Sequence, residues 1–534
     1  MLAGAEQVEI VLRERHATYN VLNMAPFDRA AGILLHPTSL PGFGGIGTLG
    51  AEAYRFVDFL QSAGMRHWQV LPLGPTGYGD APYSTHSALA GNPYLVALDP
   101  LIEEGLLLPA DLDPLRDLPE THVDFGRLVP AKSAVLRAAF RRVQERGAAD
   151  ASFVGFVADN RAWLDDFALF MALKDEHNGA SWIDWEPALR GRQPAALERA
   201  RERLADTIEL HRHNQYHFFA QWTALKAYAN QRDISIVGDI PIFVAFDSAD
   251  VWANQSLFKL DDDGRPTVVA GVPPDYFSAT GQLWGNPHYR WERLRDRGFD
   301  WWVERFRMLL RVVDAIRLDH FRGFAGAWEV PYGDDTAVRG EWVDGPGREM
   351  FDAIRASLGD VPIIAEDLGV ITPDVEELRD GLGLPGMKIL QFAFSTDAAD
   401  PSLPHNFTRD TVVYPGTHDN DTTVGWFASL PDSEQLAVTR YTGASGADVS
   451  WDLIRLAIAS VAVLAVVSMQ DVLRLGSAAR MNFPGRPEGN WTWRFTPGAI
   501  TALHVRQLRQ LNETYGRCEA RADGASFASQ PIRK

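Results

Sequence analysis

The sequence predicts an α/β protein whose parallel strands close into a barrel that carries large helical insertions. Two observations support this prediction. Eight short apolar segments are spread through the 534 residues, and eight parallel strands are enough to close a barrel. These segments alternate with helical sequence and most of them end in polar side chains, as in a TIM (β/α)8 barrel, where the carboxyl ends of all strands open at one mouth.

The first two predicted strands, residues 32–36 and 67–73, enclose a predicted helix over residues 51–63. The order strand, helix, strand favours parallel pairing. A glycine-rich turn at residues 41–47 follows the first strand. This turn has neither the Lys-Ser/Thr pair of a phosphate-binding loop nor the spacing of a dinucleotide-binding turn, so we expect no nucleotide cofactor.

From about residue 100 to about residue 230 the pattern becomes helical. Amphipathic segments occur near residues 131–146, 159–175 and 194–211. Together they are too long for one crossover helix. We therefore predict a helical subdomain at about residues 100–230, inserted between the second and third strands of a catalytic barrel that spans residues 24–534.

The other predicted strands are short apolar segments. They are residues 235–241, a strand that ends at Asp319, a strand that ends at Glu366, and residues 387–392, 411–414 and 465–469. The longest uncharged apolar run, residues 456–469, has 14 residues, which is short for a membrane span. It is typical of a buried helix that leads into a core strand.

The fourth predicted strand ends in a cation beside a carboxylate. Successive side chains of a strand point to opposite faces, so Arg317 and Asp319 project to the same side. A neighbouring guanidinium favours the ionised form of Asp319, which is the form that a carboxylate nucleophile needs. Taken alone, this pair also fits a surface ion pair at a strand end.

Repetition of the pattern favours a catalytic site. Glu366 follows a second apolar strand, and His418 and Asp419 follow a third. Because the carboxyl ends of barrel strands open on one face, acids that are far apart in the sequence meet in one pocket. We therefore predict that Asp319, Glu366 and Asp419 lie together at the barrel mouth.

Two loops carry aromatic side chains of the kind that stack on sugar rings. Tyr83 lies in a turn-rich loop just after the second strand, where simple packing is an equally good reading. Residues 271–285 combine glycine and proline with Tyr276, Phe277 and Trp284. Such a loop suits a lid or a sugar clamp better than a core.

The amino-acid composition argues against several classes of binding partner. A net charge of −19 argues against nucleic acid or an anionic membrane, whereas a neutral polymer is not repelled. The single cysteine, Cys518, excludes an intrachain disulfide and fits a reducing cytoplasm. Residues 261–264 resemble the start of a calcium loop but lack the further ligands, so we expect no metal site.

The first 23 residues contain charges where a signal peptide has an unbroken apolar region. We therefore expect a cytoplasmic protein rather than a secreted one. The sequence leaves its oligomeric state open between a monomer and a weak dimer.

Ordered motifs then identify a family. The motifs are HPTSLPG (36–42), GYGDAPY (77–83), AGNPYL (90–95), GDIPIFV (238–244), PPDYFSATGQLWGNP (273–287), RLDHFRG (317–323), AEDLG (365–369), GTHDNDT (416–422) and RMNFPGRPEGNWTWR (480–494). With them the chain resembles the 4-α-glucanotransferases, or amylomaltases, of glycoside hydrolase family 77, relatives of the α-amylases. The resemblance spans about residues 30–494. Residues 1–23 lie outside it as an N-terminal extension, and Met24 is a candidate start.

The resemblance implies roles for the acids. Asp319 matches the family's nucleophile, Glu366 its general acid/base and Asp419 the acid that stabilises the transition state. It implies transfer of 1,4-α-glucan segments from maltooligosaccharides, starch or glycogen, with glucose as an acceptor and no cofactor. It also implies the substrate-binding residues Tyr83, Asp239, Asp275, Tyr276, Phe277, Trp284, Arg317 and His418, with residues 271–285 as the loop that covers the substrate.

Two alternatives remain at this stage. An α-glucan hydrolase of the amylase clan uses the same acids in a wetter site, and the acids do not reveal the acceptor. A glucan-binding barrel without activity would need one of the three acids replaced, and all three are present.

Overall fold

The computed structural model describes residues 27–147, 150–274, 278–394, 397–486 and 488–519. Its centre is a closed barrel of eight strands in the order β1-β12-β11-β10-β9-β6-β3-β2, and all paired neighbours are parallel. The predicted TIM barrel is therefore confirmed. The barrel strands are β1 (Ala30–Leu34), β2 (His67–Gln69), β3 (Ser235–Pro241), β6 (Ala315–Asp319), β9 (Ile363–Ala365), β10 (Gly386–Ile389), β11 (Thr411–Tyr414) and β12 (Leu464–Ser468).

Each predicted strand overlaps one barrel strand, with differences at the ends. The second predicted strand, residues 67–73, is paired only over His67–Gln69, and the sixth turns into a 3-10 helix at Leu390–Phe392. Strand β1 begins two residues before the predicted start. Apolar runs continue past the last ladder hydrogen bond into buried loops, so hydrophobicity alone does not mark where pairing stops.

Register between strands positions the polar residues of the mouth. Strands β3 and β6 pair from Val237 with Ala315 to Pro241 with Asp319, which puts Asp239 directly opposite Arg317. All residues of β1 and β12 are buried, as expected for strands covered on both faces. Asp239 and Arg317 are buried charged residues within these strands.

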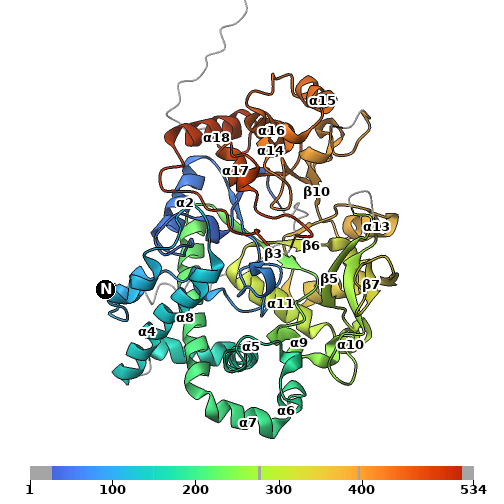
Figure 1. Cartoon of the computed structure of the whole chain (residues 1–534). Coiled ribbons are helices and arrows are strands. Elements are labelled where there is room, and N and C mark those ends of the chain that lie inside the picture. Colours follow the sequence, from blue (N-terminus) through green and yellow to red (C-terminus); the bar gives the residue numbers. More distant parts are fainter. Residues whose placement is uncertain (1–26, 148–149, 275–277, 395–396, 487, 520–534) are drawn as a thin grey trace, which may run out of the picture.

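Helices surround the barrel, and those between β2 and β3 lie below it in Figure 1. Side-chain caps define some of their ends: Asp124 accepts a hydrogen bond from the Arg127 N–H at the start of α4, and Gly147, at φ 67°, ends that helix. The helices of this region are α3 (Asp99–Glu103), α4 (Phe125–Arg146), α5 (Ala151–Glu176), α6 (Pro187–Arg190), α7 (Pro194–Arg203) and α8 (Ala205–Asn230).

The amphipathic segment 194–211 is not one helix. The chain breaks at Leu204 (φ −105°, ψ 17°), where α7 ends and α8 begins. Its apolar side chains keep a helical spacing across this break, which explains why the pattern predicts a single element. That residues 100–230 form a subdomain of their own stays a prediction.

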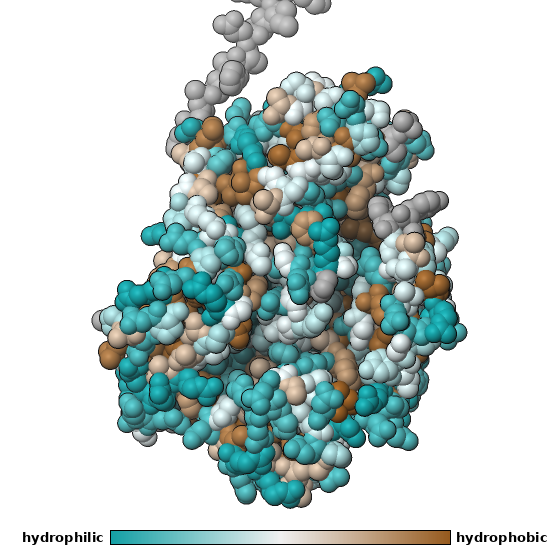
Figure 2. Space-filling view, in the orientation of Figure 1, coloured by the Kyte–Doolittle hydropathy of each residue, from teal (hydrophilic) through white to brown (hydrophobic). Residues whose placement is uncertain are grey.

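The other helices pack elsewhere around the barrel. They are α2 (Ala51–Ser62), α9 (Ala249–Ala253), α10 (Trp291–Asp296), α11 (Asp300–Val312), α12 (Gly347–Leu358), α13 (Pro373–Gly381), α14 (Thr423–Ser429), α15 (Asp432–Thr442), α16 (Val449–Ala459), α17 (Met469–Val472) and α18 (Ala502–Thr514). Within the described ranges, no helix combines the length and hydrophobicity that crossing a bilayer requires. Figure 2 shows hydrophobic side chains scattered among hydrophilic ones on one face of the molecule.

A small antiparallel sheet, absent from the sequence prediction, lies beside the barrel (Figure 1). Its strand order is β5-β4-β7-β8, with β4 (Val268–Val272), β5 (Gln282–Pro287), β7 (Gly326–Pro331) and β8 (Glu341–Asp344). Both ends of the predicted loop 271–285 thus belong to paired strands. Gly, Asn and Pro in these segments hide the strand pattern, because all three are poor strand formers.

The last described segment closes the barrel between its first and last strands. The Arg517 side chain is 1% exposed, and its guanidinium donates hydrogen bonds to carbonyls at the start of β1, before β12 and at the end of α16. The acceptors are the carbonyl oxygens of Ala30, Ala457, Ile458, Ser460, Ala462 and Val463. A buried guanidinium with carbonyl acceptors for its N–H groups stabilises this closure.

We expect Arg517→Met to destabilise the fold by about 3 kcal/mol, because charged hydrogen bonds are lost and buried carbonyls lose their donors. The change in urea midpoint measures this loss. Arg455→Met, at an exposed position of α16, is the matched control and should leave the midpoint in place. Equal midpoints for the two variants would contradict the structural role given to Arg517.

Candidate active site

The barrel strands bring six of the predicted site residues to one mouth. Asp239 lies in β3, and Arg317 and Asp319 lie in β6. Glu366 directly follows β9, while His418 and Asp419 lie in the loop after β11. Side chains separated by long stretches of sequence therefore meet because parallel strands end on the same side.

Arg317 connects two acids. Its Nη1 atom donates to Asp239 Oδ2 at 2.6 Å and to Asp319 Oδ1 at 2.9 Å. The Arg317 side chain is 4% exposed, that of Asp239 is 0% exposed and that of Asp319 is 28% exposed. Within the described part of the chain, Asp319 Oδ2 accepts no hydrogen bond, so Arg317 fixes one oxygen of this carboxylate and leaves the other available.

Asp239 balances the charge of Arg317 from inside the barrel. Its Oδ2 atom also accepts a hydrogen bond from the Tyr83 hydroxyl at 2.7 Å. Burial raises the pKa of Asp239 to about 7, and the Arg317 guanidinium opposes this shift. The other oxygen, Oδ1, is buried and has no partner among the described residues. Asp239 thus anchors Arg317 and Tyr83 and does not face open solvent.

Glu366 is held by two backbone N–H groups. His320 N donates to Oε2 at 2.7 Å, and Leu368 N donates to Oε1 at 2.9 Å. Burial, followed by the nearby charge of Asp319, raises the pKa of Glu366 to about 8. Arg317 and the two N–H groups act in the opposite direction. Glu366 therefore carries a proton at neutral pH and is able to donate it.

Asp419 is the most exposed of the three acids, with 44% of its side chain accessible. Asn482 Nδ2 donates to Asp419 Oδ1 at 2.6 Å, and His418 Nε2 lies 3.4 Å from Oδ2. The Arg480 guanidinium donates to the Asp419 carbonyl oxygen at 2.7 Å. The segment after β12 thus fixes both the backbone and the carboxylate of Asp419.

Aromatic rings line the mouth beside these acids. The rings of Tyr83 and His418 are stacked, with centroids 5.2 Å apart and an interplanar angle of 15°. The buried Trp491 contacts both, at 6.0 Å from Tyr83 and 5.9 Å from His418. His418 thus covers one face of the Tyr83 ring.

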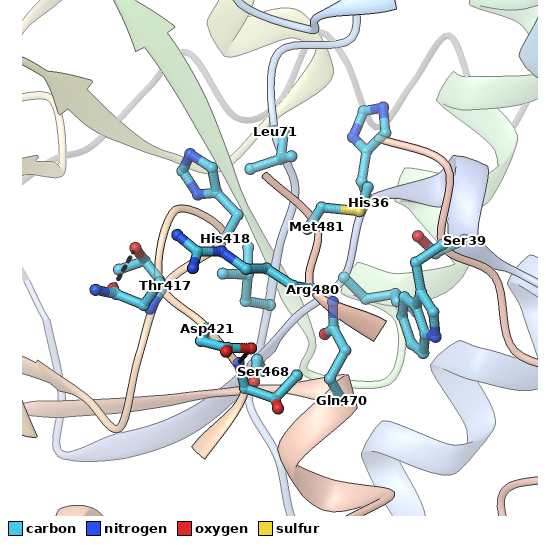
Figure 3. Close-up of a pocket in the computed structure, with 15 residues that line it drawn as sticks. His36, Ser39, Leu71, Thr417, His418, Asp421, Ser468, Gln470, Arg480 and Met481 are labelled. Atoms are coloured by element: carbon cyan, nitrogen blue, oxygen red, sulfur yellow. Dashed lines mark hydrogen bonds between the residues drawn. The ribbon is translucent and has the colours of Figure 1, made fainter. Parts of the chain in front are cut away.

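A small cavity of about 20 Å³ lies behind His418 (Figure 3). In this view His36 and His418 lie on either side of Met481. The Nδ1 atoms of both histidines are buried and have no partner among the described residues. The volume is sufficient for one water molecule, which would satisfy such atoms. Burial lowers the pKa of His418, so its ring is neutral and has one donor and one acceptor nitrogen.

The predicted covering loop is described in part. Trp284 in β5 is 38% exposed, and its ring meets that of His320 edge-on, with centroids 4.7 Å apart and an angle of 87°. Asp275, Tyr276 and Phe277 lie outside the described residues, so their predicted roles stay predictions.

The described residues contain no group of three or more His, Cys, Asp or Glu side chains arranged to hold a metal. At the turn 261–264, Asp261 Oδ1 accepts hydrogen bonds from the N–H groups of Asp263 and Arg265. The acidic run there forms a turn, as its sequence indicates.

Sequence reasoning missed several contacts of the site. Asn482, Arg480 and Trp491 all lie in the motif at residues 480–494, but no role follows from its composition because it belongs to no strand or helix. His320 lies beside Asp319, yet its contribution is a backbone N–H that side-chain chemistry does not reveal. For Asn482, Arg480 and Trp491, the signal in the sequence was the length of the motif that contains them.

Comparisons with known proteins relate the chain to one enzyme family. A family model described as 4-alpha-glucanotransferase matches residues 35–501. The 4-alpha-glucanotransferase of Thermus thermophilus is 51% identical over 495 residues, which cover 91% of this chain and 98% of that protein. The chloroplastic/amyloplastic 4-alpha-glucanotransferase of Solanum tuberosum is 44% identical over 501 residues, which cover 92% and 86% of the two chains.

Solved structures show the same architecture. The amylomaltase of Streptococcus agalactiae, in complex with acarbose, superposes with a TM-score of 0.89 at 40% identity and covers 92% of this chain and 100% of its own. The amylomaltase of Corynebacterium glutamicum, at 20% identity and a TM-score of 0.72, covers 92% and 74% of the two chains and shares the fold. From the family model and these relatives, the chain belongs to the 4-α-glucanotransferases of glycoside hydrolase family 77.

Proposed function

We propose that this enzyme transfers a segment of a 1,4-α-D-glucan to the 4-hydroxyl of glucose or of another 1,4-α-glucan, with retention of configuration. The observation that carries the mechanism is the contrast between two carboxyls at one mouth. Asp319 accepts a hydrogen bond from the Arg317 guanidinium, whereas Glu366 is buried with a raised pKa. Two carboxyls with opposed environments are suited to the nucleophile and the acid of a retaining glycosidase.

In the first step, Glu366 gives its proton to the glycosidic oxygen while Asp319 attacks the anomeric carbon. The carbon–oxygen bond to the leaving sugar breaks and a covalent glycosyl-enzyme forms on Asp319. This geometry needs carboxyls about 5–5.5 Å apart, closer than in inverting enzymes. Arg317 supports the step because it holds one oxygen of Asp319 and directs the other toward the mouth.

In the second step, Glu366 is ionised and acts as a base. It takes the proton of the acceptor's 4-hydroxyl, whose oxygen attacks the anomeric carbon and displaces Asp319. Two inversions retain the α-configuration. Asp419, fixed by Asn482, faces the same mouth and stabilises the positive charge that develops on the sugar.

Other groups of the mouth hold the sugars. The partly exposed Tyr83 ring provides a stacking surface, and the neutral His418 offers hydrogen-bonding capacity for sugar hydroxyls. Trp284 provides an exposed indole on β5, which forms an antiparallel hairpin with β4. We extend this role to Asp275, Tyr276 and Phe277 from the sequence alone, as parts of the substrate-covering loop 271–285.

The covalent step has a direct test. Glu366→Gln given a maltosyl fluoride, whose leaving group needs no proton, should accumulate an adduct that protein mass spectrometry detects. Peptide mapping should place it on β6 at Asp319. The double variant Glu366→Gln/Asp319→Asn should form none, and an adduct on another residue would move the nucleophile elsewhere.

Loss of the nucleophile should exceed loss of a sugar contact. We expect Asp319→Asn to lower the initial rate of glucose release from maltotriose by roughly 10³-fold or more, because the covalent step is deleted. Tyr83→Ala should keep measurable activity. Asp360→Asn, at a position with an 88% exposed side chain, is the control and should match wild type. Comparable rates for Asp319→Asn and the control would refute the assignment.

The raised pKa of Glu366 predicts an alkaline limit of activity. With a pKa of about 8, this carboxyl is protonated below that pH and loses its proton as the pH rises. We therefore expect kcat/KM for maltotriose to fall about tenfold per pH unit above this point. Circular dichroism at each pH separates this loss from unfolding. A decline that begins near the ordinary pKa of a glutamic acid would contradict the protonated state of Glu366.

Product analysis separates transfer from hydrolysis. Transfer conserves the number of glycosidic bonds, so wild type given maltotriose should produce longer maltooligosaccharides and glucose with little gain in reducing ends. Trp284→Ala should raise the ratio of hydrolysis to transfer severalfold, because an apolar face beside the acids is lost and water enters. We expect the same from Tyr276→Ala/Phe277→Ala.

Tyr332→Ala serves as the control for Trp284→Ala, since Tyr332 is 49% exposed and directly follows β7 of the same sheet. Its product ratio should equal that of wild type. Chains that only shorten in wild type, with reducing ends that climb steadily, would instead identify a hydrolase.

A further inference from the structure

The turn after β6 contains a residue in an unusual backbone conformation. His320 has φ 53° and ψ 51°, in the left-handed region, and directly precedes the 3-10 turn Phe321–Phe324. Residues other than glycine rarely adopt this conformation, although Asn, Asp and His do so more often than others. Such a backbone at a functional site persists only when its surroundings hold it.

This conformation aims a donor at Glu366. The His320 N–H lies 2.7 Å from Glu366 Oε2, and the next N–H, that of Phe321, donates to the Glu366 carbonyl oxygen at 3.0 Å. The turn therefore holds both the carboxyl group and the backbone of Glu366. With the Leu368 N–H on the other carboxyl oxygen, the plane of the group is fixed.

The side chain of His320 makes the second contact. Its ring meets Trp284 edge-on at 4.7 Å, and Trp284 lies in β5 of the hairpin that borders the mouth. The contact is an aromatic one and therefore depends on where the indole lies. One residue thus contacts the hairpin through its ring and Glu366 through its backbone.

Arg322, in the same turn, also contacts the loop after Glu366 and the antiparallel sheet. Arg322 donates a hydrogen bond to the carbonyl oxygen of Val370, in the loop after Glu366. Its guanidinium also lies over the ring of Trp342 in β8, 4.0 Å from the ring centroid. The turn thus connects the antiparallel sheet with the loop of Glu366 at two points.

We propose that His320 is a positioning residue that couples the β4–β5 hairpin to Glu366. The Trp284 contact holds the His320 ring, the ring helps to hold the left-handed backbone, and that backbone presents the N–H to the Glu366 carboxyl. The position of Trp284 in β5 is thereby transmitted to the Glu366 carboxyl. The inference rests on the proposed role of Glu366 as acid/base.

Two substitutions separate the backbone from the ring. Asparagine tolerates the left-handed conformation, so His320→Asn keeps the N–H in place and removes the ring. Valine disfavours that conformation, so His320→Val displaces the N–H as well. The charged groups that face Glu366 are Asp319 and Arg317, and both variants leave them unchanged.

We expect His320→Val to lower kcat for maltotriose roughly 10- to 100-fold with KM nearly unchanged, because the Glu366 carboxyl loses one of the two N–H groups that orient it. The alkaline limb of its pH profile should move to higher pH, because the ionised form of Glu366 loses a donor. The pH profile of His320→Asn should keep the alkaline limb of the wild-type enzyme. If His320→Val does not fold, His320→Ala replaces it. If a folded His320→Val or His320→Ala variant keeps the alkaline limb of the wild-type pH profile, the proposal is wrong.

A double-mutant cycle tests the coupling and uses only the variant that preserves the backbone. Trp284→Ala should lower kcat by a smaller factor in the His320→Asn background than in wild type, because the ring that contacts the indole is already absent. If Trp284→Ala lowers kcat by the same factor in both backgrounds, the two residues are not coupled and the proposal is wrong. Failure of the proposed function is distinguished separately, because Glu366→Gln would then retain activity on maltotriose whatever the His320 variants show.

Discussion

The site depends on one buried guanidinium. Three acids of the mouth, Asp239, Asp319 and Glu366, lie near a single cation, Arg317. An unpaired guanidinium inside an apolar barrel would be strongly destabilising, and Asp239 and Asp319 offset that cost. One cation does not neutralise three ionised carboxylates, and the most weakly compensated of them, Glu366, keeps its proton. The different protonation states of Asp319 and Glu366, on which the proposed mechanism depends, therefore follow from the number of charges as well as from the positions of the side chains.

Much of the fold and of this charge arrangement could be predicted from sequence because each signal is local. A short apolar strand that ends in an acid reveals both a barrel strand and a site residue, and parallel closure brings those ends together. The pairing of Asp239 with Arg317 needs the register of β3 and β6, which no local pattern contains. The antiparallel sheet escaped prediction for a related reason: its strands contain Gly, Asn and Pro and gain their stability from one another.

The residues missed at the site share a physical cause. Asn482 and Trp491 lie on a segment without regular structure, so no periodicity indicates which side chains face the mouth. His320 contributes through a left-handed backbone, and a histidine next to a nucleophile looks like a candidate base when only its ring is considered. Burial lowers the pKa of the His320 ring to about 3, which removes it from acid/base chemistry near neutrality. A sequence states which groups are present, whereas hydrogen bonds from the backbone depend on dihedral angles that distant contacts impose.

The acids and the hairpin belong to parts of the molecule with different constraints. Arg317 is inside the barrel, is paired with the buried Asp239 and donates to Asp319, so the position of Asp319 is fixed by the core. Trp284 is exposed on β5, an edge strand of the small sheet, and few buried contacts restrain it. In the proposed mechanism, a glycosyl-enzyme is hydrolysed if water reaches the anomeric carbon first and undergoes transfer if a sugar hydroxyl does. Side chains at the edge of the mouth, such as Trp284, control which of the two enters. The same acids are therefore compatible with either outcome, and in the proposed mechanism the peripheral sheet is where a preference for transfer arises.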